Sequence, residues 1–144
     1  MRSGGTEDSA FLNPRFLLDT HIVVRWLSDP RKLSREQTRV LDDAVRRGEC
    51  VAVSAISLLE LALLGEGRQR IRTGLNELFQ QLETNPAFRI LPLTIDIAQE
   101  AAALGGSLRD PADRAIVATA RVHRLRLLTS DQRIIESDLV PVIE

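Results

Sequence analysis

The sequence predicts an α/β fold, a three-layer α/β/α sandwich with a mostly parallel sheet of four or five strands between helices. Short apolar runs alternate with segments of helical pattern, which is typical of a parallel sheet covered on both faces. The chain has 144 residues, a common size for one domain. Since no internal repeat and no long linker divides it, we expect a single domain over residues 15–144, preceded by a loose polar leader over residues 1–14.

Five runs are expected to form the sheet, because each is short, apolar and bounded by polar or turn-forming residues. They are RFLLD (15–19), CVAVS (50–54), RILPL (89–93), LRLLT (125–129) and LVPVI (139–143). The last run contains Pro141, which is tolerated in a strand at the edge of a sheet. We therefore place it at an edge.

Helices are expected between these runs, where apolar residues recur with helical spacing. The predicted segments are 20–27, 35–48, 55–64, 71–83, 95–104, 111–123 and a short turn at 131–137. The segment 71–83 has one apolar face, made by Ile71, Leu75, Leu78, Phe79 and Leu82. A glycine is predicted to end the helix 35–48, and GEGR (65–68) is predicted to end the helix 55–64.

The composition excludes several classes of protein. A formal net charge of −1 gives no global basic field for nucleic acid. All the basic residues except Lys32 are arginine, which reflects either codon usage or guanidinium groups that bind phosphates. Cys50 is the single cysteine, so no disulfide framework is expected. Without a signal peptide or a membrane-spanning run, we expect a cytoplasmic protein with no membrane partner.

Four acidic residues are predicted to meet at one edge of the sheet. Asp19 ends the first predicted strand, Asp131 follows the fourth, and Glu60 lies early in the helix after the second. Asp113 opens a helix that runs antiparallel to the strands, so its first turn lies at the same edge. Ligands of such sheets bind at the carboxyl ends of the strands, which makes these acids candidates for a site.

Helix capping offers another interpretation for most of these acids. Asp19 is also a suitable N-cap for the helix that follows it. Asp131 is also a favourable first-turn acid beside an N-capping Ser130. In the sequence DPAD, Asp110 is the favoured cap, with proline in the first helical position and Asp113 reaching back.

Glu60 has the weakest structural explanation. Its helical neighbours three and four residues away are Ile56, Ser57, Leu63 and Leu64, so the helix offers it no polar face. A capping box from Ser57 would start the helix late. A buried carboxylate needs a partner, and no basic residue occurs between residues 48 and 66. A cation from outside the chain would supply that partner.

Converging carboxylates repel one another and raise their own pKa values. A hard divalent cation relieves this repulsion, and ligation by oxygen alone favours Mg²⁺ or Mn²⁺ over zinc. Such an ion activates water and stabilises charge on phosphoryl oxygen. The acids therefore point to metal-assisted phosphodiester hydrolysis.

Four stretches, in this order and spacing, resemble the motifs of PIN-domain nucleases, and most closely those of VapC toxins. They are LLDTH (17–21), SAISLLELAL (54–63), RDPADRAIVATA (109–120) and LLTSD (127–131). The resemblance covers residues 15–142. It implies an α/β/α sandwich, an endoribonuclease that depends on Mg²⁺ or Mn²⁺, an RNA substrate, a homodimer, and a VapB-like antitoxin whose tail occupies the active site.

By this resemblance, Asp19, Glu60 and Asp113 match the acidic triad of the family, and Asp131 matches its more variable fourth acid. The acids are expected to receive hydrogen bonds from three hydroxyl groups that do not themselves bind the ion, those of Thr20, Ser54 and Ser130. Two arginines on the helix that begins at Pro111 are candidates for contact with RNA or antitoxin, or for a solvated face: Arg114 and Arg121. His21 and His123 are interpreted as structural.

Two rival functions remain on a similar sheet. A receiver domain needs a lysine at the sheet edge, and a dehalogenase-type phosphatase needs an acid where His21 stands, so this class fits poorly. No glycine-rich phosphate loop is present either. The second rival is a catalytically degenerate module that binds RNA or protein on the same fold. RNA cleavage that a chelator abolishes would distinguish the metal-dependent nuclease from this module.

Overall fold

A computed structural model describes residues 13–66 and 74–144. Over these residues the sheet has five strands in the order β3-β2-β1-β4-β5, and every neighbouring pair is parallel. The strands are β1 (Phe16–Leu18), β2 (Val51–Ser54), β3 (Phe88–Leu91), β4 (Arg126–Leu128) and β5 (Val142–Ile143). The predicted parallel sheet is confirmed. The run 139–143 supplies an edge strand only over Val142–Ile143, so Pro141 lies just before that strand.

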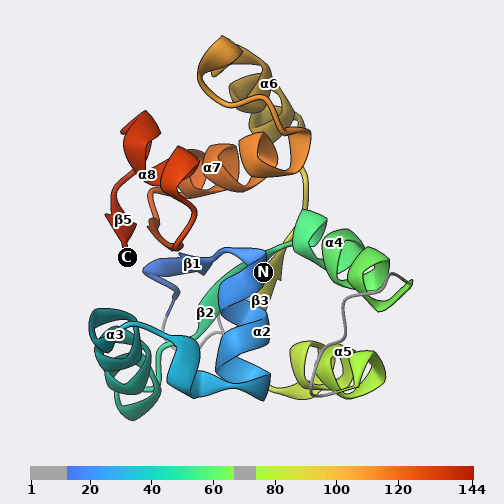
Figure 1. Ribbon diagram of the computed structural model, residues 1–144, viewed down its shortest axis with the longest axis vertical. Coiled ribbons are helices and arrows are strands. Elements are labelled where there is room, and N and C mark those ends of the chain that lie inside the picture. The colour runs from blue at the N-terminus through green and yellow to red at the C-terminus, as the bar shows by residue number, and fades with distance from the viewer. Residues whose placement is uncertain (1–12, 67–73) are drawn as a thin grey trace, which may run out of the picture.

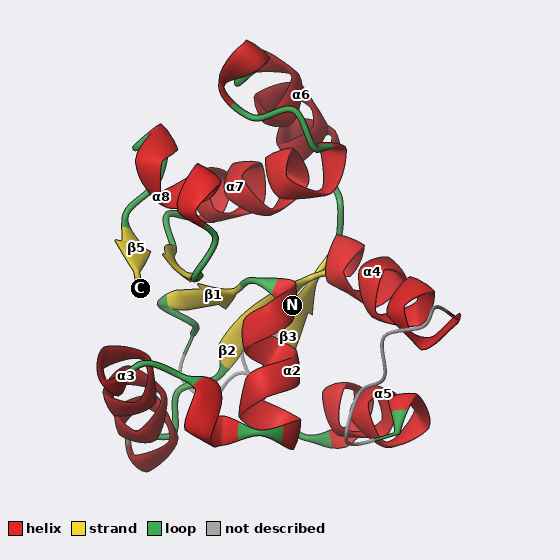
Figure 2. Cartoon of the chain, viewed as in Figure 1, coloured by secondary structure: helices red, strands yellow, loops and turns green. Residues whose placement is uncertain are grey.

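Helices cover both faces of this sheet (Figures 1 and 2). Those packed on one face are α2 (Thr20–Ser28), α3 (Arg35–Arg46), α4 (Ala55–Glu66) and α5 (Leu75–Thr84), and those on the other are α6 (Ile95–Ala103), α7 (Pro111–His123) and α8 (Gln132–Ser137). Short 3₁₀ turns follow α2 and α6 at Pro30–Lys32 and Gly105–Ser107. Within the described parts of the chain, no helix is long and apolar enough to cross a bilayer.

The strands divide their side chains between two hydrophobic cores, because successive residues of a strand point to opposite faces. Phe16 and Leu18 of β1 pack with α2, α3 and α4, whereas Leu17 packs with α7 and α8. In β2, Val53 and Ala52 divide in the same way. The central strands are buried on both faces, which explains why their sequences are apolar throughout.

Some predicted boundaries were wrong. The helix 55–64 continues to Glu66. Gly65 lies within this helix, and it allows close packing because a Cβ atom there would lie 2.6 Å from Leu75 Cδ2. The run 89–93 forms a strand only over Phe88–Leu91, which ends before Pro92, a residue without an N–H for the ladder. Of the helix predicted over 71–83, Leu75–Thr84 is seen. Residues 71–73, with Ile71, and residues 1–12 of the predicted leader lie outside the described residues.

The amino ends of β1 and β2 are tied together by a buried carboxylate. Glu49 is 4% exposed, and its side chain accepts from Arg15 Nε at 2.8 Å and pairs with Arg47 Nε at 3.2 Å. Because both arginines are about half exposed, they can be solvated again once the acid is removed. Removing the charge of Glu49 therefore costs the free energy of its charge-assisted hydrogen bonds, and it leaves no buried charge without a partner.

Glu49→Gln is expected to lower the free energy of unfolding by about 1–2 kcal/mol, because the neutral amide cannot hold both guanidinium groups. Urea unfolding measures the loss. Glu36→Gln is the matched control, since its ion pair with Arg39 lies on the surface, and it should change the free energy of unfolding far less than Glu49→Gln does. Equal effects of the two variants would contradict the assignment.

Candidate functional site

An acidic pocket opens where β1 and β4 end. These two strands are neighbours. The strands β2 and β3 lie on the far side of β1, and β5 lies on the far side of β4. Sheets of this kind bind ligands at the point where the strand order reverses in this way. Among the described residues, the pocket is lined by five carboxyl groups, a histidine, an arginine, a threonine and two leucines: Asp19, Thr20, His21, Glu60, Leu63, Leu64, Asp110, Asp113, Asp131 and Arg133. The predicted meeting of Asp19, Glu60, Asp113 and Asp131 is therefore seen.

Asp19 combines a structural position with a place in the pocket. Its backbone N–H extends the β1–β4 pairing by donating to Leu128 O at 3.0 Å. Asp19 is 5% exposed. Its Oδ1 accepts from Thr20 N at 2.8 Å as the N-cap of α2, and its Oδ2 accepts from the Thr129 hydroxyl at 2.7 Å. The capping interpretation is correct, and hydrogen bonds to both carboxylate oxygens hold the same side chain in the lining of the pocket.

Glu60 lies half-buried on α4 and has a neutral partner. Thr20 Oγ1 donates to Glu60 Oε1 at 2.5 Å, and the Ser57 hydroxyl lies 2.8 Å from Thr20 Oγ1. Burial raises the pKa of Glu60, and the charges of Asp19 and Asp110 raise it further, against the Thr20 hydrogen bond that lowers it. Among the described residues, the partner given to this acid is a hydroxyl group, and the charges that act on it are those of other acids.

Asp110 caps a helix, as predicted, and Asp113 lies in the pocket. Asp110 is the N-cap of α7, where its Oδ1 accepts from the backbone N–H groups of Ala112 and Asp113 at 2.8 and 3.2 Å. The Asp113 side chain is 14% exposed and lies in the pocket. Burial, followed by the charges of Asp110, Asp19 and Asp131, raises the pKa of Asp113 to about 7, although Arg133 opposes the shift.

Asp131 is the N-cap of α8, and this corrects the prediction for Ser130. Asp131 Oδ1 accepts from Arg133 N at 2.9 Å. Ser130 lies outside the helix, and its hydroxyl oxygen accepts from Arg25 at 3.2 Å. Burial works against ionisation of Asp131, but hydrogen bonds from the Arg133 side chain and backbone outweigh it and lower the pKa of Asp131.

The hydroxyl group that supports the acids beside β4 is Thr129 rather than the predicted Ser130. Thr129 is fully buried. It donates to Asp19 Oδ2 and accepts from Asp131 N at 3.1 Å, so it joins two acids of the pocket. Thr20 is confirmed as a neighbour of Glu60, whereas Ser54 Oγ accepts from Ile56 N at 3.2 Å at the start of α4. A threonine directly after a predicted strand and two residues before an acid was the signal available in the sequence.

Thr129→Val is expected to lower the free energy of unfolding by about 2 kcal/mol, because it preserves the shape and removes the hydroxyl partner of the buried Asp19 carboxylate and of the half-buried Asp131 N–H. Urea unfolding of the metal-free protein measures this. Ser130→Ala removes the adjacent, exposed hydroxyl and should cost no more than about 0.5 kcal/mol. A larger effect for Ser130→Ala than for Thr129→Val would show that the serine is the supporting residue after all.

His21 and Arg133 also line the pocket, and neither was assigned to the site from the sequence. His21 Nε2 accepts from Ser130 N at 2.9 Å, and His21 Nδ1 lies 3.6 Å from Asp19 Oδ2. Burial lowers the pKa of His21, with the charge of Asp19 opposing, so the ring is neutral near pH 7 and positions the loop after β4. Arg133 lies across Asp131 and reaches Asp113. Its position two residues after Asp131 was the available signal.

Arg114 and Arg121, the predicted contacts for RNA or antitoxin, have partners within the chain. Arg114 Nε donates to Leu108 O at 2.7 Å, and its NH2 group donates to Gly105 O. Arg121 Nε donates to Glu100 Oε2 at 2.6 Å, and its NH1 group donates to Leu139 O at 2.5 Å. Both guanidinium groups therefore hold helices and loops together.

The donor set suits a hard divalent cation. Its oxygens come from carboxylates. Burial, followed by the charges of the neighbouring acids, raises the pKa of Asp113 to about 7, and a bound cation would favour the ionised form against both effects. As the side chains lie, no three histidine, cysteine or acidic groups of the described residues are already arranged to hold an ion. Asp19, Glu60 and Asp131 are instead satisfied by hydroxyl, amide and guanidinium donors, so binding an ion would require small movements of these side chains.

Comparison with known proteins identifies the family. Residues 16–138 match the family described as PIN domain. The chain belongs to the PIN-domain family. This PIN domain is 37% identical over 119 residues to Ribonuclease VapC22 of Mycobacterium tuberculosis (strain ATCC 25618 / H37Rv), an alignment that covers 82% of this chain and 88% of the relative.

Solved structures share the fold of this PIN domain. FitAcB from Neisseria gonorrhoeae has a TM-score of 0.63 and 29% identity, with 90% of this chain and 96% of that chain covered. A toxin–antitoxin complex from Klebsiella pneumoniae has a TM-score of 0.62 and 23% identity, with 89% and 95% covered. DNA-bound VapBC from Salmonella typhimurium has a TM-score of 0.66 and 17% identity, with 90% and 97% covered. The α/β/α sandwich predicted from the sequence is thus the PIN fold.

Proposed function

We propose that this PIN domain is an endoribonuclease that depends on Mg²⁺ or Mn²⁺ and acts as the toxin of a VapBC-type toxin–antitoxin pair. The observation that carries the proposal is the meeting of Asp19, Glu60, Asp113 and Asp131 in one pocket at the carboxyl ends of the strands. The 37% identity to a ribonuclease of the VapC group supports RNA as the substrate. The shared fold with a toxin–antitoxin complex supports the role as a toxin.

Asp19, Asp113, Glu60 and Asp131 are the residues that would hold the ion. When bound, a divalent ion lowers the pKa of a water molecule and stabilises negative charge on a phosphoryl oxygen. Thr129 fixes the orientation of Asp19, and Thr20 fixes that of Glu60. These hydroxyl groups hold the carboxylates in the lining of the pocket, so the side chains start close to one another when they move to bind an ion.

A protein partner is part of the same proposal. The side chain of Leu63, on α4, is 55% exposed although it lines the acidic pocket, and Leu59 beside it is exposed to the same extent. Apolar surface next to a functional pocket is suited to burial by a partner. We propose that a segment of a VapB-like antitoxin covers this rim, and that exposed apolar residues elsewhere, such as Ile95, contribute to a homodimer.

RNA cleavage in the presence and absence of metal tests the enzyme. Purified protein is incubated with single-stranded and structured RNA together with Mg²⁺, Mn²⁺ or a chelator. Cleavage with either ion and none with chelator is expected, and cleavage that survives chelation would contradict the proposal. Growth arrest on expression, relieved by a co-expressed VapB-like protein, tests the role as a toxin. A protein that binds RNA under every condition without cutting it would instead be the catalytically degenerate module.

A further inference from the structure

Arg133 is the one arginine that lines the acidic pocket among the described residues. Its Nε and NH2 groups lie over the two carboxylate oxygens of Asp131 at 3.4 and 3.3 Å, and the same NH2 group lies 3.8 Å from Asp113 Oδ2. One guanidinium group therefore spans an acid from α7 and an acid before α8. Both are acids that the proposed function assigns to the metal ion.

The contacts of Arg133 are loose and exchangeable. Its side chain is 74% exposed, and every distance to a carboxylate oxygen is 3.3 Å or more, beyond the usual length of a charge-assisted hydrogen bond. Arg114 and Arg121, by contrast, donate to backbone carbonyl oxygens that cannot move away. The side-chain partners recorded for Arg133 are pocket acids, so an ion that draws those acids together removes what holds it there.

We infer that Arg133 is a built-in counter-cation of the metal-free pocket, displaced from Asp113 and Asp131 when a divalent cation binds and then placed at the rim to bind an RNA phosphate. The inference rests on the proposed function. A guanidinium group and a divalent cation cannot both make full use of the same carboxylate oxygens, so they compete. Once displaced, the long exposed side chain stays within reach of the pocket mouth, where its planar fork matches the geometry of a phosphate.

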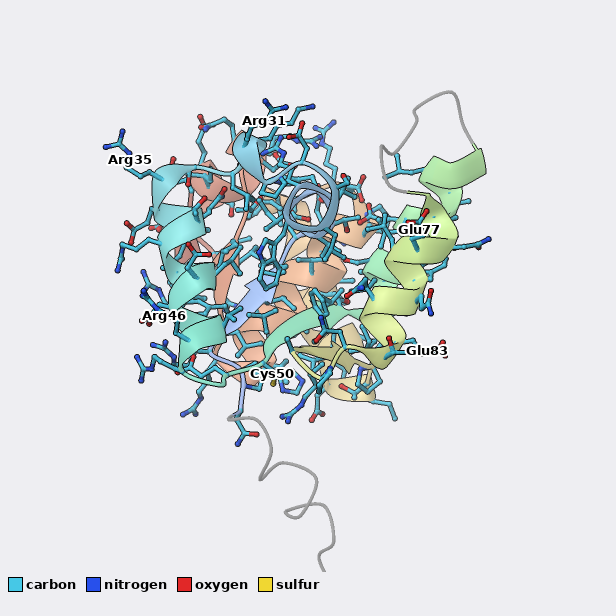
Figure 3. All side chains as sticks on the ribbon, turned by 90° about the horizontal axis from the view of Figure 1, so that it is seen from below. Arg31, Arg35, Arg46, Cys50, Glu77 and Glu83 are labelled. Atoms are coloured by element: carbon cyan, nitrogen blue, oxygen red, sulfur yellow. The ribbon has the colours of Figure 1, made fainter. Side chains whose placement is uncertain are left out.

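Competition is tested first, without RNA, by isothermal titration of the full chain with Mn²⁺. Arg133→Gln is expected to bind Mn²⁺ about fivefold more tightly than the unaltered protein, the change that follows from removing one partly exposed ion pair. Arg133→Lys keeps the charge but loses the fork and should fall between the two. Arg35→Gln removes the same charge from the outer surface of α3, where the side chain points into solvent (Figure 3), and should leave Mn²⁺ affinity unchanged.

If Arg133→Gln binds Mn²⁺ with equal or weaker affinity while the unaltered protein does bind it, the inference is overturned and the proposed function still stands. If the unaltered protein binds neither Mn²⁺ nor Mg²⁺, the proposed metal-dependent function fails. Thermal unfolding of each metal-free variant checks that it is folded, and little change is expected at so exposed a side chain.

The released guanidinium is tested with single-stranded RNA that carries 2′-O-methyl groups to block cleavage. With Mn²⁺ present, Arg133→Gln should flatten the dependence of log affinity on log salt concentration by about 0.7, the contribution of one phosphate contact on a single strand. Without metal the slope should not change, because Arg133 is then engaged by the acids. An unchanged slope in the presence of Mn²⁺ would overturn this second step.

Discussion

Asp113→Asn is expected to reduce RNA cleavage by at least about a hundredfold at saturating Mg²⁺, because a ligand that shares a metal's charge stabilises the transition state by several kcal/mol. Asp110→Asn should keep cleavage within about fivefold of the unaltered rate. The two acids stand three residues apart, and both line the pocket. They differ in that Asp110 caps α7 through its side chain, and asparagine is as good an N-cap as aspartate.

The pair of variants forms its own control. Both remove one carboxylate charge from the same pocket, so a general electrostatic effect on RNA binding would appear in both. Initial rates of cleavage of a labelled RNA, measured across a range of Mg²⁺ concentrations, separate loss of metal affinity from loss of chemistry. If Asp110→Asn lost activity and Asp113→Asn kept it, the roles of the two acids would be the reverse of those proposed.

The metal-free protein is expected to lose stability as the pH rises from about 4 to about 7. The pKa of Asp113 is raised to about 7 in the folded state, whereas an unfolded aspartate has a pKa of about 3.9. The folded state therefore holds a proton across this window that the unfolded state releases, and the free energy of unfolding falls with increasing pH. For Asp113 alone the loss amounts to about 2–4 kcal/mol.

Comparison with Asp113→Asn isolates this contribution, since other groups titrate in the same range. The lowered pKa of His21 acts in the opposite direction, because a histidine kept neutral by burial costs stability as the pH falls. Thermal unfolding with chelator at pH 5 and pH 8 measures the difference. Asp113→Asn should be more stable than the unaltered protein at pH 8, and this advantage should be much smaller at pH 5. Equal stability at both pH values would rule out an Asp113 carboxyl group with a raised pKa.

Magnesium should reverse this loss in the unaltered protein alone. An ion present at a hundred times its dissociation constant stabilises the folded state by about 2.7 kcal/mol, and Asp113→Asn weakens the binding that provides it. At pH 8 the order of stability of the two proteins should therefore change when Mg²⁺ is added. A similar stabilisation of both proteins would place the ion elsewhere on the chain.

The sequence was sufficient to predict what depends on local pattern and on the order of elements. The alternation of apolar runs and helices predicted the parallel sheet, and the spacing in DPAD predicted both the cap by Asp110 and the position of Asp113. The convergence of the acids followed from one rule, that parallel strands bring their carboxyl ends to the same edge.

The roles of Thr129, His21 and Arg133 depend on side-chain directions between elements far apart in the sequence, and no periodicity encodes these. Thr129 and Asp19 are 110 residues apart and meet only because β4 lies beside β1. The position of Gly65 inside a helix, packed against Leu75, was missed for a related reason. A glycine that ends a helix and a glycine that lets another helix approach look alike until the neighbour is known.

The two hydrophobic cores lie on opposite sides of the sheet, and the pocket draws its acids from both sides. Asp19 and Glu60 belong to the layer of α2 and α4, whereas Asp113 and Asp131 belong to that of α7 and α8. An ion shared among them would link the two helical layers to each other across the end of the sheet. Hydrogen exchange should then slow in both helical layers when metal is added, far beyond the residues that touch it.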